Sequence, residues 1–504
     1  MDGTSKVDKK QYLILAVVCL LYLIFRLGWQ DTIEFGYDQP LLASKVIEFF
    51  KNPNWIESYE FVGTNPWGFP SWGPMQLFFW VPFILMSRDP IILSLSAAVF
   101  NMLSIILIFI IGKRYFSLKV AVFSSLFLAI HPWWVVFSRM IYEPTPVPTI
   151  IAFSILLSFY VFEKKKTSVV VLLIISWAAL IQIYIHTFSF VVTSVLFLLA
   201  SIKKTSKKYM VLGFLLSLLL FLPVFHYYVK YPDRSLDLLK VLEEFNKGDL
   251  ESGHSTRDVL PEFLKTISGD GFEWQLGYAY PEFQKELKIA APAILATITT
   301  LAVLIYGFIS VFEKGYGKHK TILLLLWTLA PVWFLFLINT PIALPRYFLM
   351  SLPPLSILFG LAVEKFYTKV KYFTLIAALF VLFWWLVFNA IYLSFIGNYK
   401  YPSGFLSHYS DVPYLFLKDA VLWIIEDSAK KGYIEFTISN DINKPYEFSL
   451  NAATEYVLKY VYEIEFRDAG SMNIGHYLLI YSNESIDVTV LKQFGPYIVA
   501  YPKI

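Results

Sequence analysis

The sequence predicts a polytopic α-helical membrane protein with a small C-terminal α/β domain. Three observations predict this fold class: 57% of the 504 residues are hydrophobic, only 16% are charged, and the apolar residues fall into long uninterrupted runs. Soluble globular chains are nearer to about one quarter charged. Acids and bases are sorted into different segments, so the net charge of +4 gives no indication of nucleic acid as a partner.

Eleven apolar runs are long enough to cross a hydrocarbon core about 30 Å thick. The first, 11–27, follows three lysines and lacks a small-residue cleavage site, so it is interpreted as an uncleaved signal anchor. The other predicted spans are 90–112, 119–137, 145–162, 168–185, 187–202, 208–227, 288–312, 320–338, 345–363 and 371–395. One further run, 75–87, is too short for a span and is interpreted as an interfacial or re-entrant helix.

Basic residues in the short connections set the predicted orientation. With the amino terminus in the cytoplasm, six cytoplasmic segments contain 19 Lys or Arg against 5 Asp or Glu. The external loops 28–89 and 228–287 and the tail 396–504 then lie outside, and each has more acids than bases. The sequence therefore predicts a multi-pass plasma-membrane protein with a bundle at 1–395 and an extracytoplasmic domain at 396–504.

The two largest external segments have their own patterns. The insert 228–287 is polar, and it is expected to form a partly helical lid or acceptor platform. The C-terminal segment opens with an amphipathic helix at 412–426. It continues with strand-like runs at 433–438, 461–466, 476–482, 487–492 and 496–501 and a helix near 451–460. This pattern indicates a small α/β domain.

Candidate site residues cluster on the predicted external face. Glu34 and Asp38 follow the first span closely, and Asp38 stands where the N-cap of the next helix is expected, so capping is its alternative role. Arg139 and Glu143 lie on a tight external turn, where a surface ion pair is the alternative. Arg346 begins a span at the same face, where it is either a ligand or a snorkelling cation.

The predicted spans carry no Asp, Glu, Lys or Arg near mid-depth. An ion-coupled transporter usually needs such carboxylates, so this pattern argues against a pump or symporter. External carboxylates, cations and histidines above an apolar bundle suit a reaction on a lipid-linked anionic substrate. The further candidate substrate-binding residues on this face are Glu34, Tyr37, His131, Tyr184, His186, Tyr347 and His408.

Three motifs resemble those of integral-membrane GT-C glycosyltransferases, in the branch of the protein O-mannosyltransferases and lipid A aminoarabinose transferases. The motifs are Gly36-Tyr37-Asp38-Gln39 after the first span, Ser138-Arg139 with Glu143 after the third, and the run 345–354 before the tenth. The resemblance covers roughly residues 10–395. It departs from the family pattern at Gln39, where relatives often have a second acid, and in the spacing from Arg139 to Glu143.

The resemblance implies transfer of a sugar from a polyprenyl-phosphate donor to an acceptor at the outer face, with inversion. It implies Asp38 as the general base or as an organiser of the acceptor, and Glu143 as a second catalytic carboxylate. It also implies Arg346 and Arg139 as ligands of the donor phosphate. The acceptor stays open among a protein, a glycolipid and a cell-envelope glycan. The sequence establishes no cofactor, and a divalent cation (Mg²⁺ or Mn²⁺) at Asp38 and Glu143 stays open.

Two other functions remain open from the residues alone. A polyprenyl-lipid flippase or transporter has a similar number of spans but needs no base at Asp38. A lipid-polymer ligase or polymerase of another membrane fold shares the external site and the lipid donor, and is expected to depend more on arginines and a histidine than on Asp38.

Overall fold

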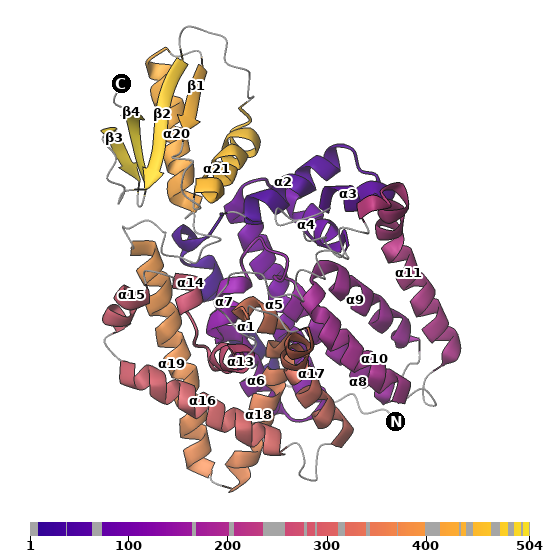
Figure 1. The fold of residues 1–504 in the computed structure, drawn as a ribbon. Coiled ribbons are helices and arrows are strands. Elements are labelled where there is room, and N and C mark those ends of the chain that lie inside the picture. The colour runs from indigo at the N-terminus through magenta and orange to yellow at the C-terminus, as the bar shows by residue number, and fades with distance from the viewer. Residues whose placement is uncertain are drawn as a thin grey trace.

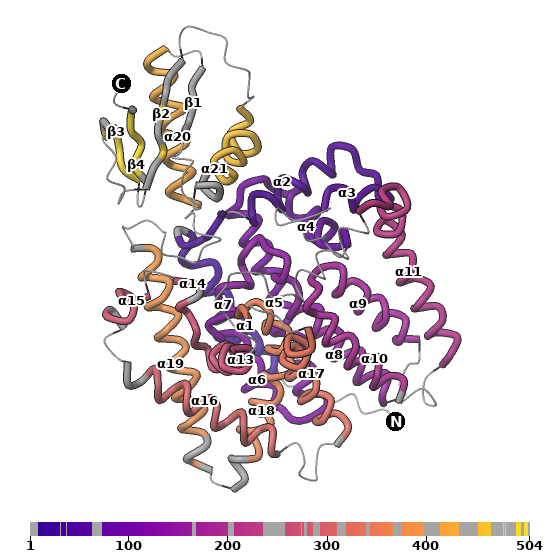
Figure 2. The backbone as a smooth tube through the Cα atoms, in the orientation of Figure 1, coloured from indigo at the N-terminus to yellow at the C-terminus, as the bar shows by residue number. Residues whose placement is uncertain are grey.

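A computed structural model shows a helical bundle that carries a small mixed domain at one end (Figure 1). It describes residues 9–36, 38–62, 73–163, 168–200, 206–234, 258–276, 280–287, 290–310, 318–338, 343–369, 371–398, 414–432, 435–439, 447–464, 474–481, 488–494 and 497–502. The predicted fold class is confirmed. Figure 2 shows the chain crossing the domain end of the bundle through α2, α3 and α4 before it returns to the bundle.

Apolar helices form the bundle. Among the described residues, six segments have the length and hydropathy of a membrane span. They comprise α1 (Lys9–Leu27), α5 (Pro90–Tyr115), α11 (Lys207–Lys230), α17 (Lys318–Leu337), α18 (Leu352–Lys369) with the turn before it, and α19 (Lys371–Asn398). The other apolar helices are α4 (Met75–Met86), α6 (Leu118–Ile130), α8 (Val147–Phe162), α9 (Val169–Ile183), α10 (Phe188–Ala200) and α16 (Ala290–Ser310). The run predicted as interfacial is α4, which is 12 residues long.

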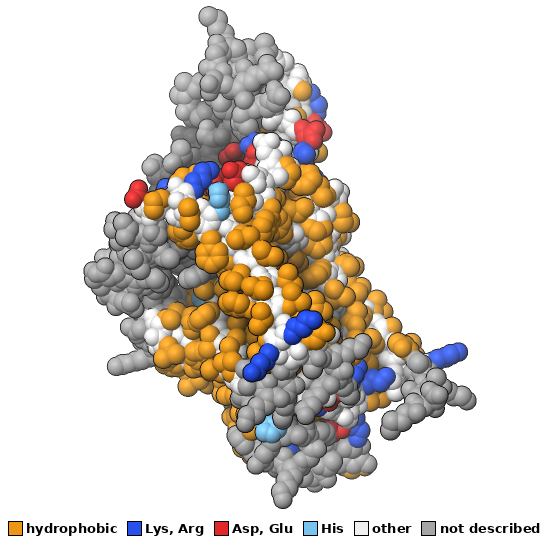
Figure 3. All heavy atoms as spheres, turned by 90° about the vertical axis from the view of Figure 1, so that its right-hand side faces the viewer, with side chains coloured by type: hydrophobic (Ala, Val, Ile, Leu, Met, Phe, Trp, Pro, Cys, Tyr) orange, Lys and Arg blue, Asp and Glu red, His pale blue; other side chains and the backbone are white. Residues whose placement is uncertain are grey.

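The outer surface of the bundle is apolar. Figure 3 shows a broad hydrophobic band on the face that includes α11, with charged side chains toward its two ends. On α11 this band includes Val211, Phe214 and Leu215, which are more than half exposed. Such a surface is unfavourable in water and suits a hydrocarbon environment.

The predicted span 119–137 is interrupted, because α6 ends at Ile130 and α7 (Pro132–Phe137) begins after His131. Pro132 has no amide hydrogen and disfavours helical backbone at the preceding residue. Two carbonyls freed at the end of α6 accept hydrogen bonds from buried side chains. Arg26 Nη1 donates to Ala129 O at 2.6 Å, and Asn389 Nδ2 donates to Ile130 O at 2.8 Å.

The predicted span 345–363 also begins differently from a continuous α-helix. Its first turn is the 3₁₀ helix η7 (Pro345–Ser351), and α18 starts only at Leu352. Pro353 and Pro354 stand in the first turn of α18, where a proline costs no helical hydrogen bond. The tighter η7 turn carries Arg346 and Tyr347 at the end of the bundle.

The first external loop forms η1 (Gln30–Thr32), α2 (Asp38–Lys51), η2 (Trp55–Glu57) and α3 (Ser58–Val62). The described part of the second external insert is helical, as expected: α13 (Val259–Ser268), α14 (Glu273–Leu276) and α15 (Tyr280–Leu287). Gly269 and Gly271 make the turn between α13 and α14 with φ of 78° and 88°. Left-handed backbone of this kind favours glycine.

The C-terminal domain consists of α20 (Tyr414–Lys430), β1 (Glu435–Ser439), α21 (Glu447–Tyr456), β2 (Ile474–Tyr481), β3 (Val488–Phe494) and β4 (Tyr497–Pro502). Its sheet has the order β1-β2-β4-β3, with β1 parallel to β2 and the other pairs antiparallel. The strand predicted at 461–466 is wrong over its described part. A π-helical turn (Val457–Val461) continues α21 as far as the first of these residues. The Tyr462 and Ile464 amides then donate to the Val457 and Leu458 carbonyls, so this backbone pairs with the end of the helix instead of a neighbouring strand.

Small residues allow the close helix crossings around α6. A Cβ added at Gly360 of α18 would lie 2.3 Å from Ser124 Oγ and 2.7 Å from Val120 O, both on α6. At Gly213 of α11, the nearest atom to such a Cβ is the flexible end of Ile174, at 3.0 Å. The backbone oxygen at Gly360 cannot yield as a side chain can.

We therefore expect Gly360→Ala to destabilise the bundle by about 1–3 kcal/mol, the usual cost of overpacking. Gly213→Ala is the matched control and is expected to cost clearly less. Thermal unfolding of the purified variants in detergent measures the difference, and equal losses of thermal stability would contradict the assignment of the α6–α18 crossing.

Candidate functional site

Three residues from separate elements are joined at the domain end of the bundle. Asp38 is the first residue of α2, Tyr142 lies in the turn between α7 and α8, and Arg346 is the second residue of η7. Arg346 Nη1 donates a hydrogen bond to Tyr142 Oη, and the Tyr142 hydroxyl is hydrogen-bonded to the Asp38 carboxylate. A cation and a carboxylate are thus connected through one phenol hydroxyl, which we call the Arg–Tyr–Asp link.

Glu143 and Lys45 add one charge of each sign beside this link. Lys45 lies on α2 two turns after Asp38, and its Nζ donates to Val62 O at 3.2 Å. The Glu143 carboxylate interacts electrostatically with Asp38, Lys45 and Arg346. Two acids and two bases therefore share one site. The attraction between opposite charges offsets part of the free-energy cost of removing each of them from water.

The environment shifts the ionisation of these residues at the domain end of the bundle. Burial, and then the charge of Asp38, raise the pKa of Glu143 from its ordinary value of 4.5 to about 7. Burial also raises the pKa of Asp38, against the opposing effects of Arg346, Tyr142 and Lys45. Because the two carboxylates repel each other, they are expected to titrate as a pair, with the last proton leaving close to neutral pH.

Aromatic side chains form the wall next to Arg346. The His186 ring stacks on Tyr347 with centroids 3.9 Å apart and planes inclined by 12°, and the Tyr184 ring lies 4.8 Å from His186. The Tyr184 hydroxyl and His186 Nδ1 are buried and have no hydrogen-bond partner. Buried polar atoms of this kind are costly unless a ligand satisfies them.

The structure thus brings together six of the residues that the sequence marked as candidates: Asp38, Glu143, Tyr184, His186, Arg346 and Tyr347. It adds two that sequence reasoning missed, Tyr142 and Lys45. Both had a local signal. Tyr142 directly precedes Glu143, and Lys45 follows Asp38 at a spacing of seven, which returns to the same face of a helix after two turns.

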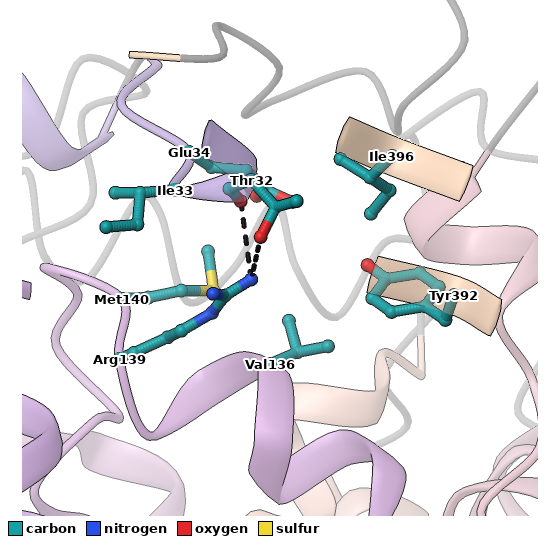
Figure 4. A pocket seen from close by; sticks show the side chains of 8 residues that line it. All are labelled: Thr32, Ile33, Glu34, Val136, Arg139, Met140, Tyr392 and Ile396. Atoms are coloured by element: carbon teal, nitrogen blue, oxygen red, sulfur yellow. Dashed lines mark hydrogen bonds between the residues drawn. The ribbon is translucent and has the colours of Figure 1, made fainter. Parts of the chain in front are cut away.

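Arg139 makes different contacts. Its Nη1 donates to Trp29 O at 3.1 Å, and its Nη2 donates to Thr32 Oγ1 at 2.5 Å. Figure 4 shows Arg139 and Thr32, joined by hydrogen bonds, at a small cavity. The volume of this cavity is about 10 Å³, which is room for about one water. The residues that line this cavity are Thr32, Ile33, Glu34, Val136, Arg139, Met140, Tyr392 and Ile396. Arg139 therefore fastens η1 to the start of the second external turn.

Two further candidates, Glu34 and His131, have other positions. Glu34 lines the Arg139 cavity and accepts a hydrogen bond from Gln275 Nε2 at 2.7 Å. His131 is buried at the break between α6 and α7, with its Nε2 3.5 Å from Ile267 O and its ring against Trp385. Tyr37 and His408 lie outside the described residues.

The residues present are a poor fit for a divalent cation. Arg346 and Lys45 already balance the negative charges of Asp38 and Glu143. Positive side chains beside the carboxylates repel a metal cation and so disfavour its binding. Ligand atoms of Glu57, Glu60 and His226 lie within 4.8 Å of one another on a different part of the surface. There Lys230 Nζ lies 2.8 Å from Glu60 and 3.8 Å from Glu57, so an ammonium group already neutralises that cluster.

The chain is similar to known proteins in part of its sequence and in its fold. Residues 75–227 match the family model of the dolichyl-phosphate-mannose-protein mannosyltransferases. The fold is similar to that of ArnT from Cupriavidus metallidurans, solved both bound to undecaprenyl phosphate and in the apo state. Each likeness has a TM-score of 0.56 and 12% identity over 98% of both chains. The fold that the resemblance implied is therefore confirmed over nearly the whole chain.

The apo oligosaccharyltransferase of Archaeoglobus fulgidus is similar with a TM-score of 0.48 and 15% identity, over 90% of this chain and 64% of that one. A comparison with curated protein sequences finds no match.

The Glu143 pKa predicts how stability depends on pH. Folding raises this pKa from 4.5 to about 7, so the folded state binds the proton more tightly, and stability falls as the pH rises through this interval. Glu143→Gln lacks the buried charge. Its gain in melting temperature over the parent protein is expected to be near zero at about pH 5 and to reach a few degrees at about pH 8.

Thermal unfolding in detergent across this pH range checks the expectation. Glu57→Gln, at a half-exposed external glutamate, is the matched control for removing one acid. A Glu143→Gln gain that is constant with pH would contradict the assigned cause.

Proposed function

We propose that this chain is an integral-membrane glycosyltransferase that transfers a sugar from a polyprenyl-phosphate donor to an acceptor hydroxyl or amine at the extracytoplasmic face. The observation that carries the proposal is the Arg–Tyr–Asp link at the end of an apolar bundle. The two catalytic requirements of such a transfer are an anchored cation for a phosphate and a carboxylate for a proton. The link joins one of each.

Arg346 is the proposed ligand of the donor phosphate. Its guanidinium lies 5.6 Å from the ring centroids of both Tyr142 and Tyr347, so two aromatic side chains help to fix its position. A guanidinium forms bidentate, charge-assisted hydrogen bonds with phosphate oxygens. These bonds strengthen as the leaving phosphate gains negative charge, which lowers the barrier to cleavage of the sugar–phosphate bond. ArnT, which shares the fold, was solved bound to undecaprenyl phosphate.

Asp38 is the proposed general base. The acceptor loses its proton to the Asp38 carboxylate while its oxygen or nitrogen attacks the anomeric carbon from the side opposite the phosphate, so one displacement inverts the configuration. Tyr142 orients the carboxylate by its hydrogen bond, and Arg346 and Lys45 favour its ionised form. Glu143 titrates near neutral pH, and its protonated form relieves the repulsion that opposes ionisation of Asp38.

Tyr184, His186 and Arg139 have contacts that suggest a binding role for the first two and a structural role for the third. Tyr184 and His186, with unpaired buried polar atoms beside Arg346, are proposed to bind the sugar or the acceptor. Arg139 is proposed to hold η1 through Thr32 and the Trp29 carbonyl. No step of this scheme involves a metal ion.

The proposed sidedness follows from the charge distribution. Placing the amino terminus in the cytoplasm puts 19 Lys or Arg and 5 Asp or Glu in the cytoplasmic segments. Asp38, Glu143 and Arg346 then lie at the extracytoplasmic end, together with the C-terminal domain. The proposed location is the plasma membrane.

Asp38→Asn is expected to lower the rate of sugar transfer by about 10²–10⁴-fold, the usual contribution of general-base catalysis. The KM for the donor is expected to change little, because Arg346 is retained. The assay incubates purified protein with a panel of radiolabelled polyprenyl-phosphate sugars and follows transfer or hydrolysis. Glu57→Gln removes an external acid outside the site and serves as the control. Unchanged turnover in Asp38→Asn would instead favour a flippase or transporter.

Arg346→Gln is expected to raise the donor KM and to reduce turnover, because the variant loses both the cation and the hydrogen bond to Tyr142. Arg346→Lys keeps the charge without the planar fork, and it is expected to recover only part of the loss. Binding of a fluorescent polyprenyl phosphate gives a second readout. Equal affinity of the parent protein and Arg346→Gln for this lipid would refute the assignment of the phosphate site.

A further inference from the structure

The C-terminal domain packs on the segment that leads into Asp38. Residues 33–35 lie between η1 and α2, and the Ile33 carbonyl accepts a hydrogen bond from the Tyr414 amide at 3.0 Å. Tyr414 is the first residue of α20. In Figure 1, α21 lies next to one end of α2, with which it is in contact, while α20 contacts η1. The domain therefore touches the external loop just before the proposed base.

Phe35 is held between two tyrosines of that domain. Its ring centroid lies 5.5 Å from that of Tyr414 and 4.9 Å from that of Tyr456, with interplanar angles of 74° and 66°. The exposed fractions of the three side chains are 0%, 0% and 1%. Edge-to-face pairs of buried rings add to stability beyond the burial of their area. We call Phe35, Tyr414 and Tyr456 the aromatic clamp.

Polar contacts attach the same domain to α2 itself. Tyr460 Oη donates to Glu48 Oε1 at 2.5 Å, and Lys459 Nζ lies 3.5 Å from the same oxygen. Glu48 lies ten residues after Asp38 on the same helix. The domain thus holds α2 in its last turn as well as the chain just before its first residue, and these two attachments restrict both translation and tilt of the helix.

Other contacts fix the domain to the bundle. Tyr456 Oη donates to the Arg88 carbonyl at 2.9 Å, and Lys418 Nζ forms an ion pair with Asp89. Asp89 also caps α5 by accepting a hydrogen bond from the Ile91 amide at 2.9 Å. Because α5 belongs to the bundle, these contacts and the clamp together fix the position of α2 relative to that long helix.

We propose that the C-terminal domain positions Asp38 against the Arg–Tyr–Asp link, and that Phe35, Tyr414 and Tyr456 are positioning residues for the transfer reaction. The inference rests on the proposed function. A first helical residue has few hydrogen bonds of its own to fix it, so Asp38 depends on what holds the chain on either side. Displacement of a reacting group by about 1 Å can cost about 100-fold in rate.

The clamp is expected to act on turnover more than on donor binding. Arg346 belongs to η7, which packs against α17, α13 and α8. None of the described clamp contacts involves η7. Loosening of the clamp should therefore displace the base and leave the proposed phosphate ligand in place.

The test compares Tyr456→Ala with the conservative Tyr456→Phe in the full-length protein. Tyr456→Ala is expected to lower the turnover number about 10- to 100-fold, with a change in donor KM of less than about threefold. Tyr456→Phe keeps the ring against Phe35 and loses only the bond to the Arg88 carbonyl, so it is expected to retain most of the activity. Val499→Ala, at a fully buried position of β4, controls for general loosening of the domain. An equal loss in Val499→Ala would overturn the proposal.

A double variant tests whether the clamp acts as one unit. Phe35→Ala alone is expected to resemble Tyr456→Ala, and the double variant is expected to be little worse than either, because each single change already releases the same segment. Losses in turnover that multiply would mean that the two residues act independently, which contradicts the clamp.

A readout without activity separates this inference from the proposed function. The carboxylic C=O infrared band of Glu143, assigned by difference from Glu143→Gln, is expected to titrate near pH 7 in the parent protein. In Tyr456→Ala its midpoint is expected at lower pH, because the Asp38 charge that opposes ionisation of Glu143 has moved away. If the Glu143 midpoint shifts but neither the parent protein nor any variant transfers sugar, the positioning of Asp38 is supported and the transferase function is refuted. Transfer with full turnover and an unshifted band in Tyr456→Ala would refute the positioning alone.

Discussion

The site depends on one electrostatic constraint, the need to offset the Arg346 cation at the end of an apolar bundle. A charge that loses its water must gain hydrogen bonds and counter-charges in return. Arg346 gains them through the Tyr142 hydroxyl and, beyond it, the Asp38 carboxylate. Lys45 and Glu143 extend this balance to four charges. Because these groups come from three segments far apart in the chain, satisfying one cation fixes the relative positions of the first loop, the second turn and η7.

Two interruptions of regular α-helix precede or contain residues of this site: α6 ends at Ile130, and the 3₁₀ helix η7 stands before α18. The break at His131 leaves carbonyl groups that Arg26 and Asn389 satisfy, and the chain then turns toward the end of the bundle where Tyr142 and Glu143 lie. The 3₁₀ turn at Pro345 has a comparable effect on Arg346. In an apolar environment every freed backbone group needs a partner, so irregular backbone is found where side chains can supply one. The departures from regular helix therefore coincide with the candidate site.

The C-terminal domain shares its core with the first external loop. Buried residues of α2, including Leu42 and Val46, belong to the same hydrophobic cluster as Leu417 of α20 and Leu479 of β2. A small mixed domain has limited apolar area of its own, and packing on α2 increases what both partners bury. This shared core gives a physical reason for the clamp at Phe35, since burial there stabilises the domain and the loop together.

Hydropathy along the chain was sufficient to determine the fold class, the locations of the apolar helices and most elements of the small domain. These features depend on composition and period, which are local. Sequence position also marked Asp38, Glu143 and Arg346, because charges beside apolar runs stand out. It did not show that Tyr142 joins Arg346 to Asp38, that Lys45 faces the same carboxylates, or that Arg139 contacts Thr32 instead. It also assigned strand to 461–466, where the described backbone closes a helix: the Tyr462 and Ile464 amides donate to the Val457 and Leu458 carbonyls. Only the tertiary structure decided these points, because the geometry of helix ends and the burial of charge depend on which distant segments meet.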